Sequence, residues 1–153
     1  MVKLSIDDIE YSISDNNKDL SNYTIFQFCS SKNINPHFNK IDFHDLKLPM
    51  EMRKNIFLIF KEAINNAAKY SGCKNIFVNM QMQTRMFILS IADDGEGFDI
   101  TNAANGNGLT NMRKRAQELE GEISLISELN KGTIIKLSLL LPEVSKVIPL
   151  NGE

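Results

Sequence analysis

The chain has 153 residues, of which 42% are hydrophobic and 24% are charged, and this favours one globular domain over a disordered segment or two ordinary domains. Seventeen basic and 19 acidic residues give a formal net charge of −2, without a long basic run, so we expect no nucleic-acid partner. The two cysteines, Cys29 and Cys73, lie in no CxxC or Cys/His cluster, which argues against a structural zinc site and a disulfide framework.

No apolar run approaches the roughly 20 residues that span a bilayer, and the first residues lack the apolar stretch of a secretory signal. We therefore expect a cytoplasmic segment that itself makes no membrane contact, with reduced thiols.

The first third of the chain has the weakest pattern. Apolar residues recur at roughly helical spacing before the polar break DNNKD and again up to Cys29. We interpret residues 1–32 as a linker with helical segments. For residues 33–43 we predict short strands that bend around Asn35-Pro36.

A stronger helical pattern begins at Pro49, because proline suits the first turn of a helix and Glu51 complements its positive end. The helix is predicted to reach about Tyr70, with Gly72 as its C-terminal stop. Its apolar stripe consists of Met52, Ile56, Ile59, Ala63 and Ala67.

The second half alternates between apolar and polar residues. Residues 75–80 and 86–92 predict one β-hairpin, and residues 122–127 and 133–141 predict another, closed by Pro142. A helix is expected between them, from about Leu109 to Glu120, with Gly121 ending it. Strands joined as hairpins, without regular βαβ alternation, indicate an α+β fold. We predict a two-layer α/β sandwich over residues 33–142, with helices on one face of a mixed, mostly antiparallel sheet, followed by a tail over 143–153.

Three polar side chains share one face of the first helix. Glu62, Asn66 and Lys69 are spaced i, i+4 and i+7, which stacks a carboxylate, a carboxamide and an ammonium group. A carboxamide oxygen suits Mg²⁺, and a lysine can pair with phosphate. An ordinary solvated helix face has the same spacing.

Two glycine-rich segments follow. In IADDGEGF, a strand ends in carboxylates and glycines, which let the backbone approach a planar ligand, and a carboxylate can accept a hydrogen bond from the amino group of adenine. A simple Asp-Gly turn is the alternative. GNGL precedes a helix whose first amides could bind an anion. It matches neither a P-loop nor GxGxxG, and a flexible loop is the alternative.

In this order, KEAINNAAKYS, DDGEGFD and GNGLTNM resemble the N, G1 and G2 boxes of the GHKL superfamily. This superfamily comprises the ATPase domains of histidine kinases, DNA gyrase, mismatch-repair ATPases and heat-shock chaperones. Residues 48–141 are similar to sensor kinases of the nitrate-sensor and lipid-desaturation-sensor type. The resemblance implies a Bergerat-type fold and the ATP-binding catalytic domain of a bacterial two-component histidine kinase, with ATP and Mg²⁺ as its ligands.

The resemblance also implies roles for single residues. Asp93 would bind the adenine amino group, Asn66 would ligate Mg²⁺, and Glu62 would orient or deprotonate a nucleophile. The remaining nucleotide-binding positions are Lys69 near the phosphates, Gly97 in the adenine pocket, Gly106 and Gly108 on the phosphate side, Thr133 near the adenine, and also Gly95, Phe98 and Leu109.

Some positions depart from the subgroup. Tyr70 stands where His is frequent, and Glu120 where a second Gly is common. The lid, residues 99–105, is short and lacks the phenylalanine-bearing box of the larger kinase class.

A histidine kinase transfers the γ-phosphoryl group to a histidine on an exposed helix. His37 and His44 lie in predicted strand or loop, so we expect the acceptor on a separate helical dimerisation domain, with a response regulator as an indirect partner. The segment IDDIEYSISDNNKDLSNY resembles the linker after such a domain. The whole kinase would be either free in the cytoplasm or membrane-bound, with this segment in its cytoplasmic part. The alternatives are an anti-sigma-type serine kinase and a non-catalytic nucleotide-binding module.

Overall fold

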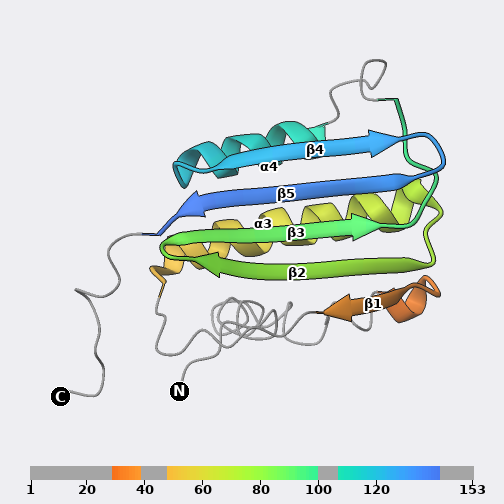
Figure 1. Cartoon of the computed structure of the whole chain (residues 1–153), viewed down its shortest axis with the longest axis horizontal. Helices are drawn as coiled ribbons and strands as arrows, with labels where there is room; N and C mark the ends of the chain where they lie inside the picture. The colour runs from red at the N-terminus through yellow and green to blue at the C-terminus, as the bar shows by residue number, and fades with distance from the viewer. Residues whose placement is uncertain (1–28, 39–47, 100–106, 142–153) are drawn as a thin grey trace.

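The computed structural model describes residues 29–38, 48–99 and 107–141. Five strands form one sheet in the order β1-β2-β3-β5-β4 (Figure 1). Only the β1–β2 pair is parallel, and the three other pairs are antiparallel. The strands are β1 (Asn35–Phe38), β2 (Asn75–Gln83), β3 (Met86–Asp93), β4 (Glu122–Glu128) and β5 (Gly132–Leu140).

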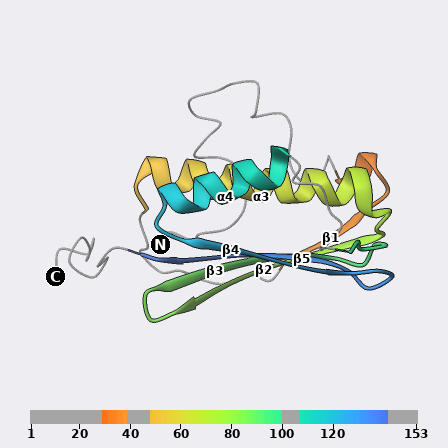
Figure 2. The same ribbon diagram turned by 90° about the horizontal axis from the view of Figure 1, so that it is seen from above.

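Helices α3 (Met50–Asn66) and α4 (Asn107–Glu118) lie side by side on one face of this sheet (Figure 2). Alternation along each strand turns every second side chain toward the helices. Burial of each Leu, Ile or Phe side chain there contributes about 1.5–3 kcal/mol. The centre of this core contains Ile56, Ile59 and Phe60 of α3, Met112 and Ala116 of α4, and Phe87, Leu89, Leu137 and Leu139 of the sheet. The predicted two-layer α+β sandwich is confirmed.

The predicted first helix begins as expected but changes character near its end. After Asn66, one wider π-helical turn, η1 (Ala67–Ser71), completes it, and the Ser71 hydroxyl donates a hydrogen bond to the Ala67 carbonyl at 2.6 Å. Gly72 then adopts φ 63° and ends the helix, as its freedom at positive φ allows. The π turn carries Lys69 and Tyr70.

The end of α4 differs from the prediction, which placed the stop at Gly121. The helix ends at Glu118, and Glu120 is the residue in the left-handed conformation, with φ 56°. The Gly121 amide donates to the Ala116 carbonyl at 2.8 Å and the Glu120 amide to the Gln117 carbonyl at 2.9 Å. These two bonds form a Schellman motif in which glycine is the usual left-handed residue.

Both predicted hairpins are present, and β2 extends to Gln83, so its turn is Thr84-Arg85. The prediction of a bend at Asn35-Pro36 was wrong. The turn precedes the strand at Asn33, which has φ 57° and closes a short helical turn. Pro36 lies within β1, where it is tolerated because β1 is an edge strand.

Residues 39–43, the tail from 143 onward, Pro142 and the linker before Cys29 fall outside the described ranges. Within those ranges, no helix is long and apolar enough to cross a membrane.

Candidate functional site

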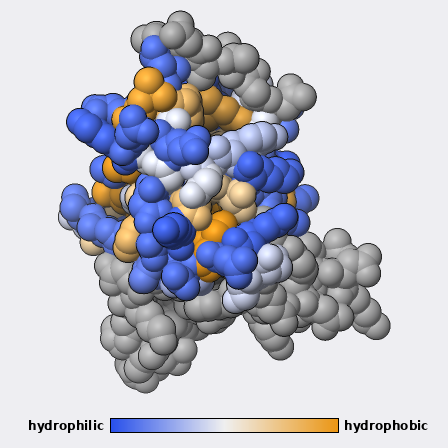
Figure 3. All heavy atoms as spheres, turned by 90° about the vertical axis from the view of Figure 1, so that its right-hand side faces the viewer, coloured by the Kyte–Doolittle hydropathy of each residue, from blue (hydrophilic) through white to orange (hydrophobic). Residues whose placement is uncertain are grey.

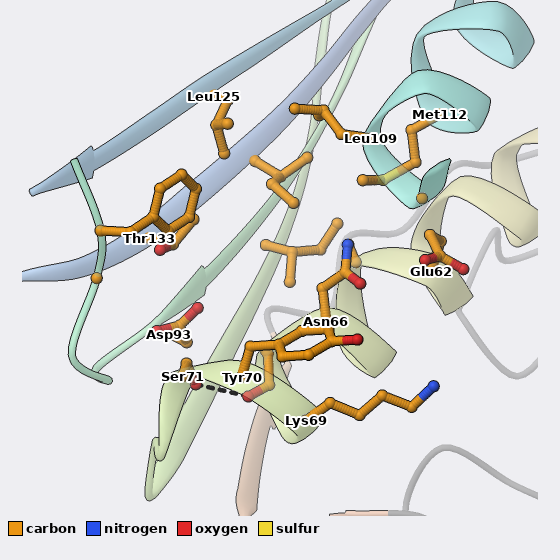
Figure 4. Close-up of a pocket in the computed structure, with 17 residues that line it drawn as sticks. Glu62, Asn66, Lys69, Tyr70, Ser71, Asp93, Leu109, Met112, Leu125 and Thr133 are labelled. Carbon is orange, nitrogen blue, oxygen red and sulfur yellow. Dashed lines mark hydrogen bonds between the residues drawn. The ribbon is translucent and has the colours of Figure 1, made fainter. Parts of the chain in front are cut away.

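A cavity of about 610 Å³ opens between the two helices and the ends of β3, β4 and β5. Figure 3 views this end of the molecule and shows hydrophobic surface between hydrophilic side chains. The predicted residues that line the cavity are Glu62, Asn66, Lys69, Asp93, Gly97, Phe98, Gly108, Leu109 and Thr133. Gly95 does not line it, and Gly106 lies outside the described residues. Residues from four separate sequence segments thus meet around one space (Figure 4).

Asp93 is the last residue of β3 and turns toward the cavity, because it shares the inward-facing side of the strand with Phe87, Leu89 and Ile91. Burial raises the pKa of its carboxyl group, and hydrogen bonds from the backbone amides of Gly95 and Thr133 oppose that increase. The Gly95 amide lies 2.9 Å from Oδ1. Asp93 is therefore a half-buried acceptor in the wall of the cavity.

The adjacent Asp94 has a structural role, because its carboxylate is bound to Lys74 and Asn75. It is exposed and accepts bonds from the backbone amides of Lys74 and Asn75, both at 2.9 Å, and from Asn75 Nδ2 at 2.7 Å. These bonds, above all the one from the Asn75 side chain, lower the pKa of the Asp94 carboxyl group. Asp94 thus fixes the start of β2 against the end of β3.

The turn after Asp93, which contains Gly95 and Gly97, packs closely against Ser71 and Glu128. A Cβ on Gly95 would overlap the backbone and side chain of Ser71, and the Glu96 amide donates to the Ser71 carbonyl at 2.8 Å. Gly97 has φ 64°, and a Cβ there would overlap the Glu128 carbonyl. Gly95 therefore acts as a packing residue behind the cavity wall, and Gly97 lets the turn pass close to the β4–β5 hairpin.

The opposite end of the cavity is lined by Glu62, Asn66 and Lys69, which reach it from α3 and η1 as their spacing predicted (Figure 4). A Cβ on Gly108, in the first turn of α4, would overlap Glu62 Oε1 and lie 3.4 Å from Asn66 Nδ2. Glycine at this position thus leaves room for a carboxylate and a carboxamide beside the start of α4. Among the described residues, neither side chain has a hydrogen-bond or ion-pair partner, nor does Lys69.

This donor set suits Mg²⁺, which takes one or two protein oxygens and completes its shell with water and phosphate. No group of three or more His, Cys, Asp or Glu side chains that could hold a metal ion occurs in the described part of the chain. Asn66 and Glu62 supply oxygen atoms of this kind at the cavity.

Sequence reasoning missed the apolar walls of the cavity and one polar residue. Ile91, Leu125 and Ile135 of the sheet and Met112 of α4 line it, yet their pattern is that of any core-facing side chain. Ser71 also lines it, and its hydroxyl group is close enough to Asp93 to lower the pKa of that carboxyl slightly. Only its position directly after Tyr70 could have indicated it.

Comparison with known families decides what kind of site this is. The family described as histidine kinase-, DNA gyrase B-, and HSP90-like ATPases matches residues 52–143. The chain belongs to this ATPase family. Membership implies that the domain binds ATP, and the matched residues include all of the cavity lining.

Curated relatives are named as histidine kinases or sensor proteins. The chain is 32% identical over 110 residues to the signal transduction histidine-protein kinase/phosphatase DegS of Bacillus subtilis, which covers 69% of this chain and 29% of that protein. It is 32% identical over 113 residues to the sensor protein VraS of Staphylococcus haemolyticus, covering 73% and 30%. For the oxygen sensor histidine kinase NreB of Staphylococcus carnosus, the identity is 29% over 109 residues, covering 69% and 31%. The chain thus spans about a third of the length of these relatives.

Solved structures share the fold at lower identity. The histidine kinase domain of a blue-light activated kinase from Erythrobacter litoralis aligns with a TM-score of 0.60 and 19% identity, covering 81% of this chain and 62% of that one. The histidine kinase AdeS of Acinetobacter baumannii aligns with a TM-score of 0.62 and 15% identity, covering 93% and 68%. These likenesses establish the fold alone.

Proposed function

We propose that this chain is the catalytic domain of a sensor histidine kinase, which transfers the γ-phosphoryl group of ATP to a histidine on a separate helical dimerisation domain. The observation that carries the proposal is one cavity with two chemically different ends. A half-buried acceptor, Asp93, lies at one end, and at the other lie a carboxylate, a carboxamide and an ammonium group that have no partner among the described residues. This separation suits a ligand with a base at one end and phosphates at the other.

At the base end, the Asp93 carboxylate accepts a hydrogen bond from the adenine amino group. The purine ring lies against apolar side chains such as Leu125 and Ile135, beside the turn that Gly97 allows. Burial of a flat ring against such a wall adds apolar contact.

At the phosphate end, Asn66 holds Mg²⁺ and the Lys69 ammonium pairs with phosphate oxygens. Gly108 and the first amides of α4 lie on the phosphate side. When bound there, Mg²⁺ would supply positive charge that offsets the charge developing on the transferred group.

Transfer breaks the bond between the γ-phosphorus and the bridging oxygen, which leaves with its electron pair on ADP. A lone pair of the acceptor imidazole forms the new N–P bond, and the proton on the other ring nitrogen is lost. Glu62, at the phosphate end, orients the imidazole or takes that proton, because a carboxylate in hydrogen-bond reach can do either. Positioning and electrostatics supply most of the acceleration.

His37 is unsuited to be the acceptor. It lies in β1, its Nε2 is 2.8 Å from Asn75 Oδ1, and its ring stacks on Phe77 with centroids 4.8 Å apart. These contacts give it a structural role. His44 lies outside the described residues.

The test combines this chain with the helical dimerisation domain of the same kinase, Mg²⁺ and ATP labelled on the γ-phosphate. We expect acid-labile label on a histidine of the helical domain and none on this chain. Strong labelling of His37 or His44 would contradict the proposal. Acid-stable label on a serine of a sigma-factor antagonist would instead identify a serine kinase, and ATP binding without any transfer would identify a nucleotide-binding module.

The relatives' names as histidine kinases favour the first outcome. We also infer a cytoplasmic location, since ATP and response regulators are there.

A further inference from the structure

Ser127 is a buried polar residue, 7% exposed, that belongs to none of the three boxes. It lies near the end of β4 and faces the helices, as does Leu125 two residues earlier. Its hydroxyl oxygen has three neighbours. The Phe98 amide is at 2.9 Å, the Gly132 carbonyl oxygen at 3.2 Å, and Thr133 Oγ1 at 2.8 Å.

The protons of this cluster can be assigned by counting. A serine hydroxyl has one proton and two lone pairs. The Phe98 amide can only donate, so it takes one lone pair of Ser127. The Gly132 carbonyl can only accept, so it takes the single Ser127 proton. All three contacts are then hydrogen bonds only if the Thr133 hydroxyl donates its own proton to the second lone pair of Ser127.

This assignment determines what Thr133 offers to the cavity. With its proton committed to Ser127, the Thr133 oxygen has only lone pairs left for a ligand. Thr133 is paired with Asp93 across β3 and β5, and both residues line the cavity. Two acceptors, a carboxylate and a hydroxyl oxygen, therefore stand side by side at the base end (Figure 4).

An acceptor pair of this kind matches an amino group, which has two protons to donate. The pair disfavours a purine with a carbonyl oxygen at the same ring position, because that oxygen is also an acceptor and can form no hydrogen bond with it. A rotatable hydroxyl would lack this discrimination, since it could turn and donate its proton to the carbonyl.

We propose that Ser127 is a positioning residue that fixes Thr133 as a hydrogen-bond acceptor and thereby makes the base end select 6-aminopurines over 6-oxopurines. The inference rests on the proposed ATP site and adds the specificity of that site. Ser127 acts through Thr133 and does not itself line the cavity.

The test compares the dissociation constants of ATP and inosine triphosphate, both with Mg²⁺, by calorimetric titration of the whole chain. The base of inosine has a 6-oxo group and no exocyclic amine. Guanine also has a 6-oxo group, but it could turn over and present its 2-amino group to the acceptor pair. We expect the unmodified chain to prefer ATP by about 100-fold or more, because a site built for hydrogen bonds rejects the analogue that lacks them. Ser127→Ala should reduce this preference about tenfold, the value of roughly one hydrogen bond.

The matched control is Ser124→Ala on the same strand, because Ser124 is exposed and lies on the opposite face of the sheet. Its preference for ATP should equal that of the unmodified chain. If Ser127→Ala weakens both nucleotides equally and keeps the preference, Ser127 only supports the fold and the inference is overturned.

Thr133→Val keeps the test decisive if Ser127→Ala fails to fold. It removes the acceptor, so the preference should fall by a similar factor, and adding Ser127→Ala to it should not lower the preference further. A full preference in Thr133→Val would overturn the inference. An unmodified chain that binds both nucleotides equally would overturn it while leaving the proposed nucleotide site intact, and one that binds neither would overturn the proposed function as well.

Discussion

The two ends of the cavity are built in different ways. At the base end, Asp93 and the turn containing Gly97 are held by hydrogen bonds that join β3, η1 and the β4–β5 hairpin. At the phosphate end, the side chains of Glu62, Asn66 and Lys69 have no such partner within the described ranges. The base end is therefore rigid before a ligand arrives, whereas the charged groups of the phosphate end are completed by the ligand.

The largest effect is expected from Gly97→Ala at the base end. Positive φ costs a residue with a Cβ about 1–2 kcal/mol, and overlap with the Glu128 carbonyl adds about 1–3 kcal/mol. We expect the free energy of unfolding to fall by about 2–5 kcal/mol in a urea titration, with loss of ATP binding.

The matched change at the other end is Gly108→Ala. Its Cβ would meet the end of the Glu62 side chain, which can move. Stability should stay within about 1 kcal/mol of the unmodified chain, while binding of ATP with Mg²⁺ weakens. Equal losses of stability in the two variants would contradict the view that the base end is more firmly held than the phosphate end.

The second prediction concerns the Asp93 carboxylate. Asp93→Asn keeps an oxygen for the Gly95 amide but replaces a charged acceptor, so ATP affinity should fall about 10- to 100-fold while the fold stays intact. Asp94→Asn is the control, because Asp94 is exposed and bonds to Lys74 and Asn75. Unchanged ATP affinity in Asp93→Asn would contradict the base-end assignment.

The pH dependence of binding tests the same group. Burial raises the pKa of the Asp93 carboxyl group, and adenine needs the ionised form as acceptor. ATP affinity should therefore weaken on acidification, beginning at a higher pH than for an ordinary aspartate. The contribution of Asp93 to folding stability changes in the opposite direction and should rise on acidification. A raised pKa means that the native state holds the proton more tightly than the unfolded state. Asp93→Asn should lack this component of the pH profile, and a profile identical in both proteins would assign the effect to the phosphates alone.

The third prediction addresses the phosphate end. Asn66→Ala removes the carboxamide that we assign to Mg²⁺, so the gain in ATP affinity on adding Mg²⁺ should shrink by about tenfold or vanish. Stability should change little, because Asn66 is only partly buried and its side chain has no described partner. Asn65→Ala on the same helix is the control. Mg²⁺ dependence that persists in Asn66→Ala would refute the metal assignment.

How far the sequence predicted the molecule depended on how local the signal was. The helix that bears Glu62, Asn66 and Lys69, and the hairpin that ends in Asp93, follow from periodicity within one segment. The four-residue strand β1 lies within residues 33–43, where strands were predicted, but the bend expected at Asn35-Pro36 was wrong because the strand is defined by parallel pairing with β2, some 40 positions along the chain. Ser127 gave no signal, since its role arises from contacts with Phe98 and Thr133 that only the folded hairpin creates.

The smallest effect is expected away from both ends, at Glu120. This residue takes the left-handed position that ends α4, with φ 56°, at a cost of about 1–2 kcal/mol relative to glycine. Glycine would relieve that strain but gain freedom in the unfolded chain. Glu120→Gly should therefore raise the free energy of unfolding by about 0.5–1 kcal/mol.

Lys114→Gly is the matched control, because it places the same residue at an exposed position inside α4, away from the bonds that end the helix. It should lower stability by about 1 kcal/mol. If the geometry of each cavity end depends only on its local contacts, ATP affinity and its Mg²⁺ dependence should be equal in both variants. Affinities that follow global stability in this pair would show that the rigidity of the base end belongs to the whole domain and not to the hydrogen bonds around Asp93 and Gly97.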